Sequence, residues 1–188
     1  MLRFNFPGDI HFVTFRTFKA CPIFKDEKCC ELFLENLEYY RKKYNLKIPG
    51  YVILWEHIHL LIWFDMDKFT DLTISKIMHG IKGYSSKLIY EYLKSKKITG
   101  RQGSYALPGL NQGSGALATK ERRVKIWQPS FYDFNINTEK KFWEKLNYIH
   151  NNPIRHGLTD DISQYKFCSW RNYELDDQSI FKIDVLDW

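Results

Sequence analysis

The pattern of apolar and polar side chains first marks the strands of this chain. Residues 10–18, IHFVTFRTF, direct successive side chains to opposite sides, which predicts a β-strand. Residues 51–64, YVILWEHIHLLIWF, are strand formers on both faces and are interrupted only near Trp55–Glu56. Such a run predicts two buried strands joined by a turn. Val124–Trp127 is predicted to be a further short strand.

Apolar residues recur with the period of an α-helix in three longer stretches. The predicted helices span residues 25–44, Asp71–Tyr92 and Thr138–Asn152. Pro153 either interrupts the hydrogen bonding of the third helix or follows its last turn. The order strand, helix, strand, strand, helix, strand, helix predicts an α+β fold, in which helices cover one face of a ferredoxin-like antiparallel sheet.

The composition changes in one internal stretch, and no linker divides the chain. The 188 residues are expected to form one domain over residues 1–188. Residues 98–123 are rich in glycine and small polar side chains, which predicts a long mobile loop or ragged hairpin, although a tolerated insertion explains them as well. Residues 154–188 form a C-terminal extension of turns and a small helix, and its apolar tail is expected to pack back on the domain.

A basic charge balance combined with many aromatic residues favours a polyanionic partner. The net charge is +6 and aromatic residues make up 17% of the chain. Single-stranded nucleic acid is the first candidate, because bases stack on aromatic rings while phosphates pair with cations. A basic enzyme with no such partner is the alternative. The candidate DNA-binding residues are Lys82, Lys87, Arg122, Arg123, Trp127, Gln128 and Arg155.

Cysteine usage and the absence of long apolar segments favour a cytoplasmic location. The four cysteines match no zinc-binding spacing, and the adjacent Cys29 and Cys30 suit a disulfide framework poorly. Reduced thiols in the cytoplasm are therefore expected. The N-terminal residues lack the apolar core of a signal peptide, and no run approaches the length of a membrane span. We expect no membrane partner.

Two histidines, His57 and His59, are set into the buried apolar run. On a strand they point to the same face about 6.6 Å apart, which suits two imidazoles that converge on one metal ion. Strand histidines that face solvent or hydrogen-bonded neighbours are the alternative. The third predicted helix offers Asn152 as an oxygen ligand and Tyr148, four residues earlier on the same helix face, as a phenol beside the ion. Such a phenol could attack a phosphate that a divalent cation positions and neutralises. A packed helix tyrosine is the alternative.

Five motifs then suggest a family: HFVTFRT, HIHLLI, IWQPSFYDFNI, YIHNNPIRHGL and QYKFCSWRNY, which together cover most of residues 10–173. In this order they resemble the REP-associated tyrosine transposases, within the single-tyrosine HUH transposase superfamily. The resemblance implies that His57 and His59 bind a metal, with Asn152 as the third ligand, and that Tyr148 is the catalytic nucleophile. It further implies Mg²⁺ or Mn²⁺, single-stranded or hairpin DNA as substrate, a 5′-phosphotyrosine intermediate with a free 3′-hydroxyl, and a monomer or homodimer.

The chain departs from the family pattern before the first histidine. Trp55–Glu56 stands where the family usually has Pro-Asn, and Glu56 could be a salt-bridging turn residue, a partner that orients a histidine, or an added ligand. We favour the turn residue. Imidazoles by themselves bind Zn²⁺ or Ni²⁺ more tightly than Mg²⁺, whereas phosphate oxygens and waters suit Mg²⁺ or Mn²⁺, so we expect a labile Mg²⁺ or Mn²⁺ site. Two other functions remain open: a non-catalytic single-stranded nucleic-acid-binding protein, and a metal-dependent phosphodiesterase that uses water.

Overall fold

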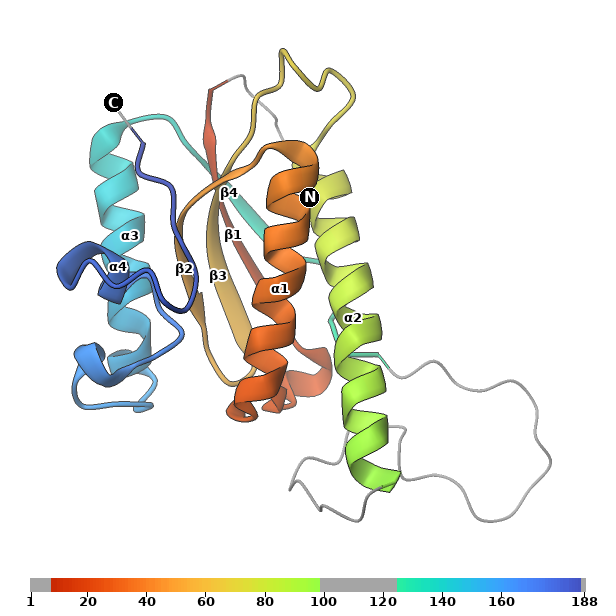
Figure 1. Ribbon diagram of the computed structural model, residues 1–188. Coiled ribbons are helices and arrows are strands. Elements are labelled where there is room, and N and C mark those ends of the chain that lie inside the picture. Colours follow the sequence, from red (N-terminus) through yellow and green to blue (C-terminus); the bar gives the residue numbers. More distant parts are fainter. Residues whose placement is uncertain (1–7, 99–124, 187–188) are drawn as a thin grey trace.

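A four-stranded antiparallel sheet forms the centre of the molecule (Figure 1). The computed structural model describes residues 8–98 and 125–186. The strands are β1 (Ile10–Arg16), β2 (Lys47–Ile53), β3 (His57–Trp63) and β4 (Tyr132–Ile136), in the spatial order β2-β3-β1-β4. Every neighbouring pair is antiparallel. The predicted α+β class, with helices packed on an antiparallel sheet, is confirmed.

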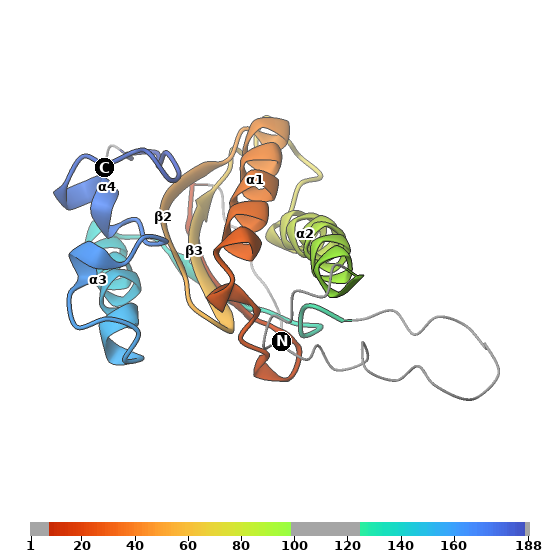
Figure 2. The same cartoon turned by 60° about the horizontal axis from the view of Figure 1, so that its bottom comes forward.

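Helices cover both faces of this sheet. Figure 2 shows α1 (Glu27–Tyr44) and α2 (Ile74–Ile98) on one side and α3 (Glu139–Arg155) on the other. The prediction that the helices lie on one face is therefore wrong. The physical reason is that the sheet is apolar on both faces: the alternate side chains of β1 enter two separate cores, Val13 and Phe15 towards α1 and α2, Ile10 and Phe12 towards α3.

The helix ends follow local capping chemistry. The Asp26 carboxylate accepts a hydrogen bond from the Lys28 amide at the start of α1, and Asn45 ends that helix in the left-handed conformation with φ of 50°. Thr138 caps α3 in the same way through the Lys141 amide. Pro153 does not end α3, which continues through it to Arg155, because a proline late in a helix removes a single hydrogen bond.

The fourth strand does not lie where the sequence predicts it. The predicted strand Val124–Trp127 is wrong in its described part, where Trp127 forms only an isolated bridge to Thr17. β4 instead begins after Pro129 and pairs with β1 from Ile10↔Ile136 to Thr14↔Tyr132. The second helix is also displaced, because it begins at Ile74 and not at Asp71, and it runs to Ile98 and not to Tyr92.

The C-terminal segment packs back on the domain, as predicted. After the short helices η3 (Ile162–Gln164) and α4 (Trp170–Glu174), Phe181 and Ile183 are buried. The Asp184 carboxylate accepts a hydrogen bond from the Ile48 amide at 2.9 Å, which covers part of the β2 edge. All four cysteines are buried free thiols. Within the described ranges, no helix combines the length and apolar character that crossing a bilayer requires.

Candidate functional site

The two histidines of the apolar run lie side by side on β3, an inner strand of the sheet. The ring centroids of His57 and His59 are 5.0 Å apart in an edge-to-face arrangement, and both side chains are buried. Thr14 of β1, which is the cross-strand partner of His59, shares its face of the sheet. The alternative that these histidines face solvent is thereby removed.

Each imidazole has its Nδ1 atom occupied by an oxygen partner. Thr14 Oγ1 lies 2.6 Å from His59 Nδ1, and Glu56 Oε1 lies 3.2 Å from His57 Nδ1. A partner on Nδ1 fixes the orientation of the ring and leaves Nε2 as the atom that can bind a metal. Glu56 lies at the turn and its carboxylate contacts His57, an arrangement that fits both a salt-bridging turn residue and a partner that orients the histidine.

Burial keeps both imidazoles neutral. It lowers the pKa of His59 to about 3, and the nearby charges of His57, His156 and Arg16 act in the same direction. Burial also lowers the pKa of His57, although the Glu56 carboxylate partly opposes this shift. A neutral imidazole retains the lone pair that a metal ligand needs.

The Nε2 atom of His59 is buried and has no hydrogen-bond partner among the described residues. Such an unpaired polar atom costs free energy unless something binds it, so this atom fits a metal ligand. Over residues 8–98 and 125–186, no group of three or more His, Cys, Asp and Glu side chains is arranged to hold a metal ion. A third ligand from these residues would therefore be of another type, such as an amide oxygen, and a water or a phosphate could complete the set.

Tyr148 of α3 contacts the histidine pair, as the motif resemblance implies. Its ring centroid lies 5.3 Å from that of His59, and Phe12 of β1 packs against both rings at 5.5 Å and 5.9 Å. Tyr148 is 37% exposed, so an incoming ligand can reach its side chain. Two segments far apart in the sequence thus place an accessible phenol beside a buried histidine.

Asn152 and His156 continue the same face of α3. The ring of His156, which is the C-terminal capping residue of α3, lies 5.0 Å from His57. Asn152 lies between Tyr148 and His156 at four-residue spacing and is buried. Its amide nitrogen donates to the Tyr148 carbonyl oxygen at 2.7 Å, which leaves Oδ1 as the atom available to a metal.

Arg155 is the one predicted DNA-binding residue that contacts this centre among those the structure describes. Its guanidinium lies 5.6 Å from the centroid of the Tyr148 ring. A guanidinium in this position packs over the ring and can pair with a phosphate beside the phenol.

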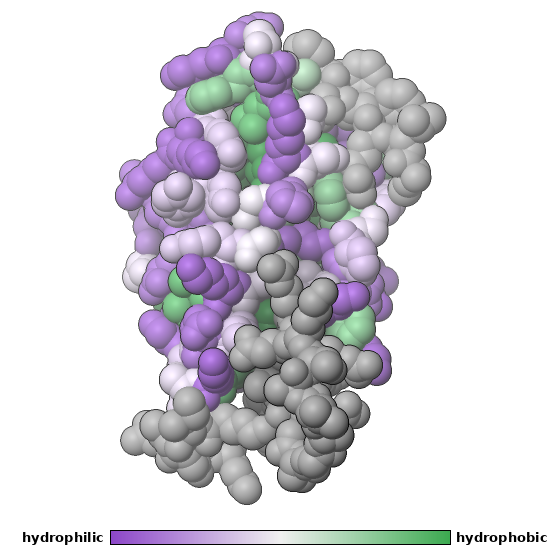
Figure 3. All heavy atoms as spheres, turned by 90° about the vertical axis from the view of Figure 1, so that its right-hand side faces the viewer, coloured by the Kyte–Doolittle hydropathy of each residue, from purple (hydrophilic) through white to green (hydrophobic). Residues whose placement is uncertain are grey.

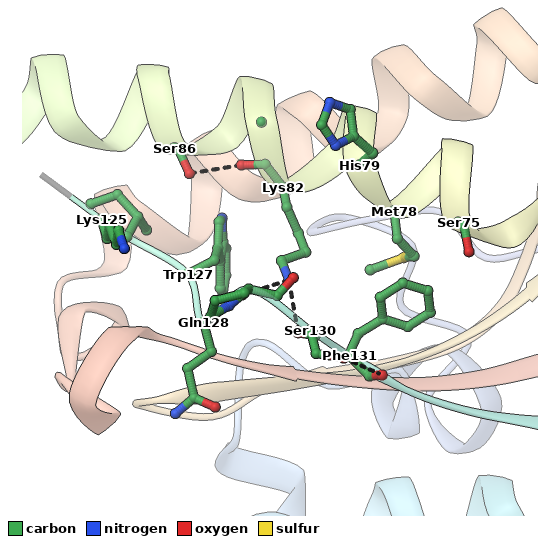
Figure 4. A pocket seen from close by; sticks show the side chains of 13 residues that line it. Ser75, Met78, His79, Lys82, Ser86, Lys125, Trp127, Gln128, Ser130 and Phe131 are labelled. Carbon is green, nitrogen blue, oxygen red and sulfur yellow. Dashed lines mark hydrogen bonds between the residues drawn. The ribbon is translucent and has the colours of Figure 1, made fainter. Parts of the chain in front are cut away.

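The other described candidates lie near a cleft of about 560 Å³ between α2 and residues 125–131, on the opposite face of the sheet (Figure 4). The Lys82 ammonium donates to the carbonyl oxygens of Gln128 and Ser130 at 2.7 Å and 2.8 Å, so this lysine holds a backbone turn. The Trp127 ring packs on Phe15, Phe24 and Phe33 in the core, so its predicted stacking on a base is not available in this structure.

Gln128 and Lys87 remain accessible. In Figure 4 the Gln128 side chain points away from α2, and the backbone amide of Gln128 donates to the Arg16 carbonyl oxygen at 2.9 Å. Lys87 is exposed on α2, whose outer surface is mainly hydrophilic (Figure 3). Neither contacts the histidine pair. Arg122 and Arg123, with most of the predicted loop at 98–123, lie outside the described residues.

Sequence reasoning assigned no role in the site to three residues that the structure brings to it: Phe12, Thr14 and Arg16. The alternation of β1 places all three on one face, which was visible in the sequence. The missing information was the register, because only the pairing of Thr14 with His59 and of Arg16 with His57 brings that face to the histidines. For His156, which follows Arg155, nothing in the sequence favours a role in the site over helix capping.

Parts of this chain are similar to known proteins. A family model described as IS200-like transposase matches residues 7–106, which include both histidines and end before Tyr148. A REP-associated tyrosine transposase of Escherichia coli K12 is 26% identical over 72 residues, covering 32% of this chain and 44% of the relative. A Haemophilus influenzae Rd protein, to which the same name is given provisionally, is 31% identical over 51 residues, covering 27% of this chain and 29% of the relative. The chain thus matches less than half the length of either relative.

A solved structure shares the fold. It is described as a REP-associated tyrosine transposase bound to a REP hairpin, and it superposes with a TM-score of 0.64 at 18% sequence identity. The superposition covers 100% of this chain and 93% of that one.

Proposed function

Because this chain belongs to the IS200-like transposase family, we propose that it is a DNA strand transferase of the REP-associated type. It cuts single-stranded DNA beside a hairpin and joins the resulting ends, with Tyr148 as nucleophile. The observation that carries this proposal is the contact of an exposed phenol with a buried, neutral imidazole, whose Nε2 finds no hydrogen-bond partner in the part of the chain that the structure describes. A hairpin of REP type is the proposed substrate, because the solved structure that shares the fold is described as bound to one.

The donor set fits a divalent cation. His57 and His59 would hold it through their Nε2 atoms and Asn152 through Oδ1, with waters and phosphate oxygens as further ligands. When bound, Mg²⁺ or Mn²⁺ neutralises the oxygens of the scissile phosphate and positions it for in-line attack. Thr14 and Glu56 contribute by fixing the two rings.

The residues of this chain supply the nucleophile and its surroundings. The Tyr148 oxygen forms a bond to phosphorus as the bond from phosphorus to the 3′-oxygen breaks. The phenolic proton is lost to solvent, and the departing 3′-oxygen takes up a proton to become a hydroxyl. The resulting 5′-phosphotyrosine keeps the energy of the phosphodiester, so a second 3′-hydroxyl can reverse the step and join the strands. Arg155, whose guanidinium lies over the Tyr148 ring, would pair with an oxygen of the phosphate that is attacked.

The proposal is tested with a labelled DNA hairpin that carries a single-stranded flank. In Mn²⁺ the protein should form a DNA adduct that survives boiling in detergent, and in EDTA it should form none. Tyr148→Phe should abolish the adduct. His57→Ala should lose cleavage but keep most of its DNA affinity, because the histidine acts through the metal and not through binding.

Three outcomes would contradict the proposal. Equal adduct from Tyr148→Phe would show that the nucleophile is wrong. Cleavage without adduct that survives Tyr148→Phe would identify a phosphodiesterase that uses water. Tight DNA binding with no cleavage in Mg²⁺ or Mn²⁺ would identify a binding protein on the same fold.

A further inference from the structure

Beside the Tyr148 site lies a row of aromatic and basic side chains, which we call the α3–β4 strip: Phe12, Tyr132, Phe134, Lys141 and Lys145. Its floor comes from the sheet, where Phe12 of β1 pairs directly with Phe134 of the edge strand β4. Its wall comes from α3, where Lys141 and Lys145 are one turn apart. Lys145 lies three residues before Tyr148, so both project from the same side of the helix.

The two lysines lie over the aromatic floor. Lys145 Nζ is 4.9 Å from the centroid of the Phe134 ring and 5.3 Å from that of Phe12. Lys141 Nζ is 5.9 Å from the Phe134 centroid. The stems of these side chains therefore cover apolar rings while their charges stay at the surface, where an anion can reach them.

The strip is continuous with the catalytic centre and open at the sheet edge. Phe12 stacks on His59 and meets Tyr148 edge-on, and on its other side it meets Tyr132 at 6.3 Å. Tyr132 is 44% exposed and begins the edge strand.

The alternation of β4 keeps its acidic residue off the strip. Asp133 points to the opposite face of the sheet, where its carboxylate lies 3.0 Å from His11 Nδ1. On the strip face, β4 therefore presents the rings of Tyr132 and Phe134 towards the lysines of α3.

We propose that the α3–β4 strip binds the single-stranded segment of DNA that adjoins the scissile phosphate. The Tyr132 ring stacks on a base, and Lys141 and Lys145 pair with backbone phosphates. An exposed ring beside cations, here that of Tyr132, suits an unpaired strand, because its bases can turn their faces to the protein, whereas a duplex keeps those faces stacked. An acidic protein surface could use the lysines but would give the Tyr132 ring no role. This inference rests on the proposed function, since it assigns a path to the same substrate.

The test compares a hairpin with a single-stranded flank against the same hairpin without it, both in a Tyr148→Phe background that cannot form the adduct. The flank should strengthen binding to the parent protein. Lys145→Glu and Tyr132→Ala should each weaken binding of the flanked hairpin by about five-fold or more, and leave the blunt hairpin nearly unchanged. Lys145→Glu should also reduce the slope of affinity against salt by roughly 0.7, the value for one single-strand phosphate contact.

Two control variants match these changes. Tyr132→Phe keeps a ring and should bind like the parent. Lys140→Glu makes the same charge reversal on α3, but its side chain projects about 140° around the helix from Lys145. It should leave the preference for the flanked hairpin unchanged.

The inference is overturned if the flank adds no affinity, if Lys145→Glu behaves like Lys140→Glu, or if Tyr132→Ala binds the flanked hairpin as the parent does. Equal weakening of both DNAs would also overturn it, because that result indicates a general charge effect. The proposed function has a separate test. If the variants lose flank binding while wild-type protein forms no Tyr148 adduct, the binding role of the α3–β4 strip is supported and the catalytic proposal is contradicted.

Discussion

Thr14→Val is the substitution that tests the support of the metal ligands most sharply. Thr14 Oγ1 lies 2.6 Å from Nδ1 of His59, which is only 3% exposed. Valine nearly preserves the shape of threonine but removes the hydroxyl, so the imidazole loses its fixed orientation and Nδ1 loses its partner. Losing the partner of a buried polar group costs about 1–3 kcal/mol of stability. Losing a residue that orients a metal ligand weakens metal binding by about 10- to 100-fold.

The assay is the rate of Tyr148 adduct formation as a function of Mn²⁺ concentration. Thr14→Val should raise the half-saturating Mn²⁺ concentration by about 10- to 100-fold, and the rate should recover largely at saturation, because the nucleophile is untouched. Thr14→Ser retains the hydroxyl and should behave like the wild type. An unchanged Mn²⁺ midpoint in Thr14→Val, together with a measured loss of stability, would refute the assignment of His59 Nε2 as a ligand and leave Thr14 a purely structural role.

Three further predictions concern glycine packing, the pH dependence of stability, and the contact of Glu56 with His57. A Cβ at Gly50 would lie 2.8 Å from a Leu146 methyl group of α3, whereas one at Gly80 would lie 2.6 Å from the Tyr40 ring on the other face. Gly50→Ala and Gly80→Ala should each lower the free energy of unfolding by about 1–3 kcal/mol, but only Gly50→Ala should slow adduct formation; equal rates would contradict this. Burial lowers the pKa of His59 to about 3 from 6.5, so in metal-free buffer its contribution to the free energy of unfolding should be fully present above about pH 7. The free energy of unfolding should fall by up to about 1.4 kcal/mol per pH unit as the pH drops from 6.5 towards 3. The fall should be shallower in a His59→Asn variant, and parallel pH curves for the two proteins in urea denaturation would refute this. Glu56→Ala should raise the half-saturating Mn²⁺ concentration about 10-fold and Glu56→Gln should raise it less, and a larger loss in the glutamine variant would oppose the orienting role of the carboxylate.

Much of the fold follows from local patterns. The alternation in β1 and the unbroken apolar run of β2 and β3 locate three strands, and capping by Asp26 and Thr138 begins α1 and α3 near their predicted starts. The fourth strand was missed although Tyr132, Phe134 and Ile136 alternate with polar residues, because so short a stretch gives a weak signal and its strand conformation depends on pairing with β1. The two-sided arrangement of helices was missed because a helix sequence shows that one side is apolar, but not which face of the sheet it meets.

Part of the candidate site also follows from local patterns, and part depends on the tertiary structure. The spacing of His57 and His59 predicts that they share a face, and the tyrosine helix is visible as a motif. The residues that orient the site come from strand register and long-range packing, which spacing along the chain does not encode. Trp127 shows the converse, because an aromatic residue near cations suggests stacking on a base until its contacts with Phe15, Phe24 and Phe33 place it in the core.

The central claim is that the Tyr148 phenol becomes covalently joined to DNA at the histidine pair. The most direct measurement is mass spectrometry of the adduct formed in Mn²⁺, after digestion with nuclease and trypsin. We expect a nucleotide joined through its 5′-phosphate to Tyr148, in the peptide of residues 146–155, and none when either His57 or His59 is replaced by alanine. A nucleotide on any other residue, or an adduct that persists in both alanine variants, would contradict it.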